Sequence, residues 1–330
     1  MHLKFPCYVE MEHAQTVLRN KLTFLENILS MYLVHIIVHV TFLQHKARAE
    51  SNPLRTSGGE HEGYNASFTL HELLTVLHNT TPSAPGPDRL HYSMLKQLHP
   101  STLEVILYLF NRIWQEGYFP SSWKVARVLP LLKAGKDPSC ASSYRPIALT
   151  SCLCKTLERM INRRLMHYLE QGKLLDKFQC GYRSSRSTVD HLVRLETVVR
   201  DAFAHGQHCL SVFFDLEKAY DTTWRYGILK DLYGLGLRGR MLRAIQSYLD
   251  RRTFQVQLGN TLPREFLQEN GVPQGGVLSV TLFIVKMNSI APVIPPSVQY
   301  SLYVDDLQIS VSSCNLSVCE RRVQLLFRST

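Results

Sequence analysis

Two adjacent aspartates carry the clearest chemical signal in the sequence. Asp305 and Asp306 lie at the centre of residues 298–311, where apolar and polar residues alternate on both sides of the pair. This period of two predicts two strands joined by a tight turn. Neighbouring carboxylates repel each other unless a cation or a basic group lies between them. The pair therefore indicates either an ordinary solvated hairpin turn or a divalent-metal site for a phosphate substrate.

A third aspartate favours the metal site. Asp215 directly follows the apolar run 208–214 (HCLSVFF), which predicts a buried strand, so we expect burial to disfavour its charge unless a counter-ion is present. A glycine-rich turn at 271–279 lies between Asp215 and the pair and would let the backbone approach a ligand closely. Three carboxylates can hold two Mg²⁺ ions, which suits nucleotidyl transfer. One ion lowers the pKa of an attacking 3′-hydroxyl, and the other neutralises the triphosphate and the leaving pyrophosphate.

The charge of the chain is concentrated in one block. The 330 residues are 45% apolar and 19% charged, an ordinary globular composition with enough length for a large core and two subdomains. The formal net charge is +10, and residues 121–200 hold 15 of the 37 Lys and Arg but 6 of the 27 Asp and Glu. Such a block suits a polyanionic substrate, and a solvated basic surface is the alternative.

The N-terminal part of the chain is the least informative. Residues 31–43 (MYLVHIIVHVTFL) are mostly apolar but fall short of the roughly 20 residues that span a bilayer. We interpret them as a buried helix or strand, with a membrane segment and an adventitious translated leader as alternatives. Residues 47–66 are polar with paired glycines, which predicts a linker. The eight cysteines include no CxxC pair, which argues against a zinc site and for reduced thiols.

Periodicity and capping signals predict the elements that would position these residues. Thr69-Leu70-His71-Glu72 is a capping box at the start of a helix. The other expected helices span residues 90–98, 102–116, 144–170, 188–204, 224–233, 239–250 and 277–290. The expected strands span residues 123–132, 208–214, 254–258, 266–269 and both sides of the aspartate pair.

Six blocks in a fixed order resemble the reverse transcriptases of non-LTR (LINE-type) retrotransposons. The resemblance covers about residues 69–313, which is most of the chain. The blocks are FTLHELLTVLHNTTPSAPGPD, SYRPIALTSCLCKTLERMINRRL, QCGYRSSRSTVDHL, VFFDLEKAYDTTW, NGVPQGGVLS and YVDD. Any one block is a weak signal, whereas six in family order are specific.

This resemblance implies roles for individual residues. Asp215, Asp305 and Asp306 match the catalytic carboxylates, and Leu216 would offer its backbone carbonyl to a metal ion. Tyr220 matches the aromatic steric gate that rejects a 2′-hydroxyl, with a core aromatic as its alternative. The other matches are the nucleotide-binding residues Lys133, Arg145, Gln274 and Gly275 and the nucleic-acid-binding residues Arg183, Arg186 and Tyr303. The implied cofactors are two Mg²⁺ ions, which Mn²⁺ could replace, with no organic cofactor.

The fold implied by the resemblance is α+β, namely the fingers and palm of a right-hand polymerase, with an antiparallel palm sheet and no thumb. We expect fingers at about 69–200 and 228–270, palm at about 201–227 and 271–313, and a leader and linker at 1–68. The chain departs from the family where Arg89 replaces a usual Gly, Val280 replaces a usual Pro and YVDD replaces the commoner Ala-Asp-Asp form. The absence of endonuclease and thumb blocks predicts a fragment, or a decayed or partially translated copy, of a longer element protein.

The expected function is RNA-templated DNA synthesis from dNTPs on a DNA primer. The family implies a nuclear or cytoplasmic protein, and the shortness of the apolar run at 31–43 argues against a membrane segment there. One alternative is a truncated, inactive remnant that at most binds RNA through residues 121–200. Another is a relative of different biology, such as an intron-encoded maturase or a domesticated polymerase.

Overall fold

Two β-sheets joined by helices organise the chain. The computed structural model describes residues 40–328 apart from 141–142, 217 and 257–263. The α-helices are α2 (Val40–Glu50), α3 (Leu70–His78), α4 (Tyr92–Lys96), α5 (Pro100–Glu116), α6 (Cys152–Gln171), α7 (Thr188–Ala204), α8 (Ala219–Thr222), α9 (Arg225–Gly234), α10 (Gly239–Leu249), α11 (Val277–Asn288) and α12 (Leu316–Arg328). The strands are β1 (Val125–Leu132), β2 (Tyr144–Leu149), β3 (His208–Phe214), β4 (Thr253–Val256), β5 (Glu265–Leu267), β6 (Gln299–Tyr303) and β7 (Asp306–Ser313). Short 3-10 helices cover Gly63–Asn65, Ser121–Trp123 and Ala291–Val293.

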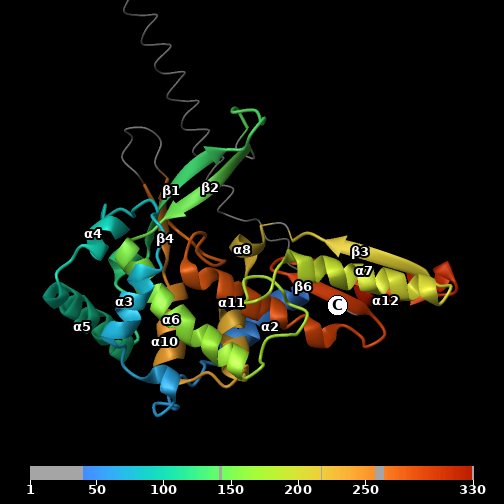
Figure 1. Ribbon diagram of the computed structural model, residues 1–330, viewed down its shortest axis with the longest axis horizontal. Coiled ribbons are helices and arrows are strands. Elements are labelled where there is room, and N and C mark those ends of the chain that lie inside the picture. The colour runs from blue at the N-terminus through green and yellow to red at the C-terminus, as the bar shows by residue number, and fades with distance from the viewer. Residues whose placement is uncertain (1–39, 141–142, 217, 257–263, 329–330) are drawn as a thin grey trace, which may run out of the picture.

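The first sheet has the strand order β2-β1-β4-β5. Strand β1 pairs antiparallel with β2 and parallel with β4, and β4 pairs antiparallel with β5. The β1–β2 pair forms the arm that projects upward in Figure 1. The strand predicted at 123–132 is confirmed as β1. The helix predicted from residue 144 is wrong in its first turns, because Tyr144–Leu149 form strand β2.

Proline and capping chemistry explain this correction. Pro146 lies opposite Pro130 in the β1–β2 register, and a proline inside a helix would remove a hydrogen bond and clash with the preceding turn. The hydroxyl of Ser151 accepts hydrogen bonds from the N–H groups of Leu153 and Cys154. These are N-cap contacts, so helix α6 begins at Cys152.

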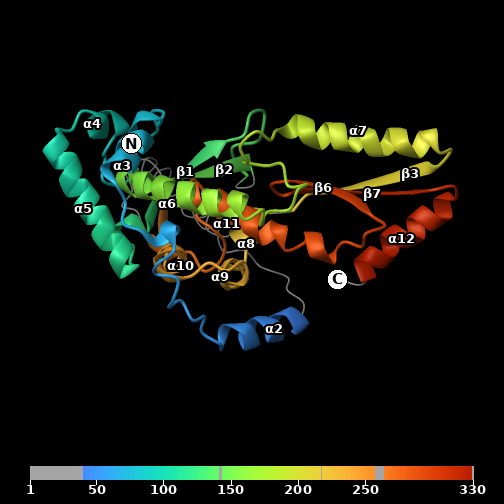
Figure 2. The same ribbon diagram turned by 60° about the horizontal axis from the view of Figure 1, so that its bottom comes forward.

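The second sheet has the strand order β3-β7-β6 and is antiparallel throughout. Helices α7 and α12 lie on opposite sides of it in Figure 2. The α+β class, with an antiparallel sheet that carries the aspartates, is therefore confirmed. Strand β3 is at the edge of this sheet, where Phe213 is 64% exposed and Asp215 is exposed. The prediction of a buried strand with a desolvated Asp215 is wrong, because β3 has a neighbouring strand on one side only.

The main hydrophobic core lies among α3, α5, α6, α9, α10 and α11. Trp114, Phe110 and Tyr248 are among its largest fully buried side chains. The capping box predicted before α3 is confirmed, since the Glu72 N–H donates to Thr69 Oγ1 at 3.2 Å and the Thr69 N–H donates to Glu72 Oε2 at 2.8 Å. Helix α6 packs against α11 within this core, so the loops at both helix starts share one rigid base.

The chain before residue 69 packs against the later helices. The Trp224 Nε1–H donates to Glu50 Oε1 at 2.8 Å, and the Trp224 ring centroid lies 5.6 Å from that of Phe42 in α2. Asn65 is fully buried, and its Oδ1 accepts a hydrogen bond from the Met241 N–H at 2.8 Å. Local sequence patterns do not predict these contacts, because the partners are far apart along the chain.

Part of the apolar run at 31–43 lies outside the described residues, which begin at residue 40. Within the described ranges, no helix combines the length and the apolar character needed to cross a membrane.

Candidate active site

The aspartate pair lies at the tip of a hairpin, as its flanking alternation predicts. Tyr303 at the end of β6 pairs with Asp306 at the start of β7, so Val304 and Asp305 form a two-residue turn. The φ angle of Val304 is 60°, which is a genuine outlier for a β-branched residue. A positive φ at the first turn position alone is the pattern of a type II′ turn, where glycine is usual. Strain of this kind costs about 1–3 kcal/mol and persists where the surrounding structure enforces it.

The fully buried Gln179 enforces this turn. Its Oε1 accepts hydrogen bonds from the N–H groups of Val304, at 3.1 Å, and Gly181, at 2.9 Å. Beside it, the Cys180 N–H donates to the Leu302 carbonyl at 2.9 Å, so this segment runs alongside β6. A Cβ atom at Gly181 would lie 2.4 Å from Val304 Cγ2, which explains the need for glycine there. The turn is therefore fixed by a segment more than 100 residues upstream.

The three predicted aspartates meet at one end of the second sheet. Phe214 of β3 pairs with Leu307 of β7, so Asp215 continues β3 at the end where Asp306 begins β7. The pKa of Asp306 is raised, first by burial and then by the negative charges of Asp305 and Asp215. None of the three carboxylates forms an ion pair with a described residue. His191 opposes the shift of Asp306, but no ion-paired cation of the described residues neutralises the cluster, so a metal ion would be attracted to it.

The three aspartates have the oxygen ligands that a divalent cation needs. Their backbone positions are adjacent, but their side chains do not point toward one common ion position. Carboxylate oxygens are the hard ligands that Mg²⁺ prefers. Within the described part of the chain, no three His, Cys, Asp or Glu side chains are arranged to hold a metal ion. Leu216 follows Asp215 directly and is 40% exposed, so its neighbourhood is open to solvent.

Tyr220 lies beside this cluster on the short helix α8. Its ring stacks on Phe283 of α11, with centroids 4.8 Å apart and an interplanar angle of 18°. The pKa of Tyr220 is raised, first by burial and then by the charges of Tyr182 and Asp305. The ring is therefore packed between Phe283 and the apolar cluster that includes Val304, the residue before Asp305. This placement is compatible both with a steric gate and with a core aromatic.

The residue after Tyr220 fixes the glycine-rich loop before α11. The Gln274 Nε2 lies 2.8 and 2.9 Å from the two carboxylate oxygens of Asp221. Burial raises the pKa of Asp221, and the hydrogen bond from Gln274 opposes that shift. Gly275 has a φ of +88°, and a Cβ there would lie 2.6 Å from the Ala148 carbonyl oxygen. Glycine is required at this position both by its backbone conformation and by the approach of β2.

A buried carboxylate anchors the other end of the same loop. Glu158 of α6 is fully buried, and its Oε2 accepts hydrogen bonds from the N–H groups of Val277, at 2.6 Å, and Leu278, at 3.3 Å. These are the first two residues of α11, where a negative charge is favoured by the helix dipole. The hydroxyl of Ser279 donates to the Pro273 carbonyl at 2.6 Å. The loop is thus held at both ends by side chains of the core.

A cavity of about 730 Å³ brings together three of the predicted nucleotide-binding residues. Lys133, Arg145 and Gln274 line it, and Lys136 adds a further cation. Its walls come from the end of β1, the start of β2 and the loop before α11. Cationic side chains of this kind match phosphate oxygens. Helix α8 contains both Asp221, which holds Gln274 in the cavity wall, and Tyr220, which lies on the side of the aspartate cluster. The helix therefore connects this cavity to the aspartate cluster.

The predicted nucleic-acid-binding residues differ in their environments. Arg183 forms a bidentate pair with Glu170, with both N–O distances 2.8 Å, and its side chain is 7% exposed. Arg186 is exposed and donates to the Lys177 carbonyl at 3.0 Å. The Tyr303 ring is half-buried, with its centroid 6.4 Å from that of His191. Arg183 is therefore engaged within the protein, whereas Arg186 is accessible.

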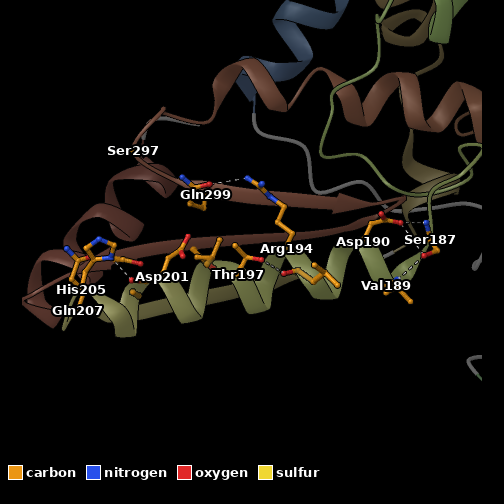
Figure 3. A pocket seen from close by; sticks show the side chains of 15 residues that line it. Ser187, Val189, Asp190, Arg194, Thr197, Asp201, His205, Gln207, Ser297 and Gln299 are labelled. Carbon is orange, nitrogen blue, oxygen red and sulfur yellow. Dashed lines mark hydrogen bonds between the residues drawn. The ribbon is translucent and has the colours of Figure 1, made fainter.

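A separate cavity of about 630 Å³ lies between α7 and the second sheet (Figure 3). Its floor includes Ser310 and Ser312 of β7, whose apolar neighbours Ile309 and Val311 belong to the cluster with Val323 of α12. Successive strand residues face opposite sides, so α12 receives the apolar face of β7 and α7 the polar one. Arg194 bridges the gap, donating to the Tyr300 carbonyl at 2.7 Å. Ala202 is the one buried residue of α7, in keeping with this polar face. The cavity contains none of the predicted site residues.

Four residues near the site are absent from the sequence-based set: Lys136, Glu158, Gln179 and Asp221. Asp221, Gln179 and Glu158 each fall inside one of the six blocks, and Lys136 lies near Lys133 in a basic segment, so all four had a local signal. Glu158 is the hardest of them to single out, since a glutamate on a long helix is ordinarily a solvated residue.

Comparisons with known proteins agree on one family. The family described as "Reverse transcriptase (RNA-dependent DNA polymerase)" matches residues 132–329. The RNA-directed DNA polymerase from mobile element jockey of Drosophila melanogaster is 31% identical, over 67% of this chain and 24% of the relative. The same polymerase of Drosophila funebris is also 31% identical, over 74% of this chain and 27% of the relative. The Pol polyprotein from a type-1 retrotransposable element R2 of Popillia japonica is 28% identical, over 64% of this chain and 29% of the relative.

The chain thus spans about a quarter of the length of these curated relatives. Among solved structures, an apo telomerase from Candida tropicalis aligns with a TM-score of 0.46 and 12% identity, over 67% of this chain and 51% of the telomerase chain.

Proposed function

The chain belongs to the reverse transcriptase (RNA-dependent DNA polymerase) family, and we propose that it forms the polymerase site with which a non-LTR retrotransposon copies RNA into DNA. The observation that carries this proposal is the continuity of the aspartate cluster with the cationic cavity. Tyr220 packs against the apolar cluster that includes Val304, the residue before Asp305. The residue after Tyr220, Asp221, holds Gln274, and Gln274 lines the cavity with Lys133 and Arg145.

Reverse transcriptases use divalent metal ions, and here Asp215, Asp305 and Asp306, with the carbonyl of Leu216, are the proposed ligands of two Mg²⁺ ions. When bound, such ions activate a primer 3′-hydroxyl and offset charge on the triphosphate. The pKa of Asp306, raised first by burial and then by the charges of Asp305 and Asp215, supports this assignment. Mn²⁺ would serve the same ligands.

The remaining residues would bind and orient the incoming dNTP. Lys133, Lys136 and Arg145 would contact its triphosphate, because cations in a cavity attract phosphate oxygens strongly. Gln274 and Gly275 would touch the nucleotide through the loop that Asp221 and Glu158 hold. The ring of Tyr220 would exclude a 2′-hydroxyl and so favour dNTPs over NTPs.

The template would be RNA and the primer DNA, with the exposed Arg186 and the half-buried Tyr303 beside the strands. The division proposed for the chain is fingers at about 69–200 and 228–270 and palm at about 201–227 and 271–313. Work on chromosomal DNA would require the protein in the nucleus.

Primer extension tests the proposal. The chain is incubated with poly(rA)/oligo(dT), dTTP and Mg²⁺, alongside an Asp305→Ala, Asp306→Ala double variant. We expect extension by the unaltered chain and none by the variant. The absence of extension by both, with folding verified by circular dichroism, would refute catalysis by this chain and favour an inactive remnant that at most binds RNA.

A further inference from the structure

A second cationic cavity lies at the opposite end of β1 from the proposed nucleotide site. It has a volume of about 430 Å³ and forms where the start of β1 meets α9 and α10. Lys124, Arg225 and Arg243 line it, and Asp250 is the acidic residue on its wall. No residue of the proposed polymerase site is part of this lining.

Lys124 is the most unusual charge in this cavity. The residue is 5% exposed, and its ammonium forms no hydrogen bond or ion pair with any residue that the structure describes. The ammonium lies 5.4 Å from the centroid of the Tyr118 ring. Burial lowers the pKa of Lys124, and the charge of Asp250 opposes this shift. A cation buried in this way is destabilising unless an anion accompanies it.

Arg225 increases the positive charge. Its Nε donates to the Gly271 carbonyl at 2.6 Å and its Nη2 to the Asn270 carbonyl at 3.1 Å, so the guanidinium is fixed in place by neutral acceptors. Burial lowers the pKa of Arg225 to about 10, and the nearby charge of Arg252 adds to this shift. No carboxylate of the described chain pairs with it.

Arg243 adds the third positive charge. It is half-buried, and its guanidinium forms no ion pair with a described residue. Asp250, the acid on the wall, lies 3.7 Å from the guanidinium of Arg251. The three cations that line the cavity therefore exceed its negative charge.

We propose that this cavity binds a phosphate group of a nucleic-acid strand. Two guanidinium groups and an ammonium, drawn from three separate elements, match the several oxygens of a phosphate. The Tyr118 ring at the cavity is 54% exposed and offers a surface on which a neighbouring base can stack. The volume lies within the range of pockets that hold a small ligand.

Equilibrium binding of a fluorescent single-stranded RNA to the full chain, measured over a range of KCl concentrations, tests this site. Arg243→Gln is the main variant, and Lys230→Gln is the matched control, because Lys230 is an exposed cation of α9 that does not line the cavity. Loss of one phosphate contact reduces the slope of log K against log[salt] by about one. We expect the slope of Arg243→Gln to be smaller by this amount, and the slope of Lys230→Gln to equal that of the unaltered chain.

Thermal unfolding with inorganic phosphate separates the possible sources of the phosphate. Phosphate is compared with chloride at equal ionic strength for the unaltered chain, Arg243→Gln and Lys124→Met, and circular dichroism verifies the fold of each variant. In one outcome, phosphate stabilises the unaltered chain but neither variant, while the RNA slope of Arg243→Gln is unchanged. The cavity would then bind phosphate, but as part of a small phosphate ester and not of a nucleic-acid strand. An unchanged RNA slope together with no stabilisation by phosphate would overturn the proposal.

Discussion

The amide nitrogen of Gln274 lies within hydrogen-bond distance of both carboxylate oxygens of Asp221, at 2.8 and 2.9 Å. The contact connects the loop before α11 to helix α8, across 53 residues of sequence. It also holds Gln274 in the wall of the cavity that Lys133 and Arg145 line. The proposed nucleotide site therefore depends on a carboxylate that need not touch the nucleotide.

Replacement of Asp221 by Ala should weaken dNTP binding. Hydrogen bonds to charged groups contribute about 1.5–3 kcal/mol, so the loss of an oriented Gln274 should raise the dNTP KM by about tenfold or more. Steady-state primer extension measures the change, and Asp221→Asn, which keeps one acceptor oxygen, should recover part of it. A fall in kcat at constant KM would instead place Asp221 among the groups that act on the chemical step.

Replacement of Gly181 by Ala should disturb the hairpin tip. The added Cβ would lie 2.4 Å from Val304 Cγ2 and 2.7 Å from the Val304 nitrogen, so the turn must shift. We expect a loss of about 1–3 kcal/mol in the free energy of unfolding, as for other overpacked sites, and at least a tenfold fall in kcat. The matched control is Gly234→Ala, where the added Cβ would meet no atom within 4 Å apart from the neighbouring backbone of its own helix. Equal kcat values for the two variants would show that the tip tolerates displacement.

Replacement of Tyr220 by Ala should relax sugar discrimination. Loss of a ring that excludes a 2′-hydroxyl should raise the kcat/KM for NTPs relative to dNTPs by about tenfold, corresponding to about 1.4 kcal/mol. Tyr220→Phe retains the ring that stacks on Phe283 and should discriminate like the unaltered chain. Unchanged discrimination in Tyr220→Ala, despite retained activity, would identify Tyr220 as a core aromatic only.

The Arg183–Glu170 pair should make stability depend on pH. The hydrogen bond from Arg183 lowers the pKa of Glu170 below its usual value of 4.5. A lowered folded-state pKa stabilises the protein above pH 4.5, and this contribution is lost as the pH falls through the folded-state pKa. Because the Glu170 side chain is 34% exposed and solvent screens the pair, Glu170→Gln should cost only about 1–2 kcal/mol at pH 7. The difference should shrink on acidification below about pH 4.5.

Urea unfolding at several pH values measures this difference. The control is Glu196→Gln, since the Arg200–Glu196 pair is exposed on both sides and should contribute less than about 1 kcal/mol. A pH-independent difference for Glu170→Gln would mean that packing, and not the charge of Glu170, is responsible.

Local sequence patterns determined most elements and the types of residue at the site. The alternation around Asp305 and Asp306 fixes a hairpin because side chains of a strand face opposite sides in turn, and Thr69 with Glu72 fixes a helix start through neighbouring hydrogen bonds. These effects act between residues close in the chain, so the sequence alone reveals them.

Tertiary structure decided the features that depend on distant partners. Residues 144–149 became a strand because β1 is available for pairing, and Asp215 is exposed because β3 lies at a sheet edge. Gln179 supports the Val304 turn, and Glu158 caps α11, across 125 and 119 residues of sequence respectively. No local periodicity encodes such contacts, because their free energy arises only when packing brings the two groups out of water and into bonding distance.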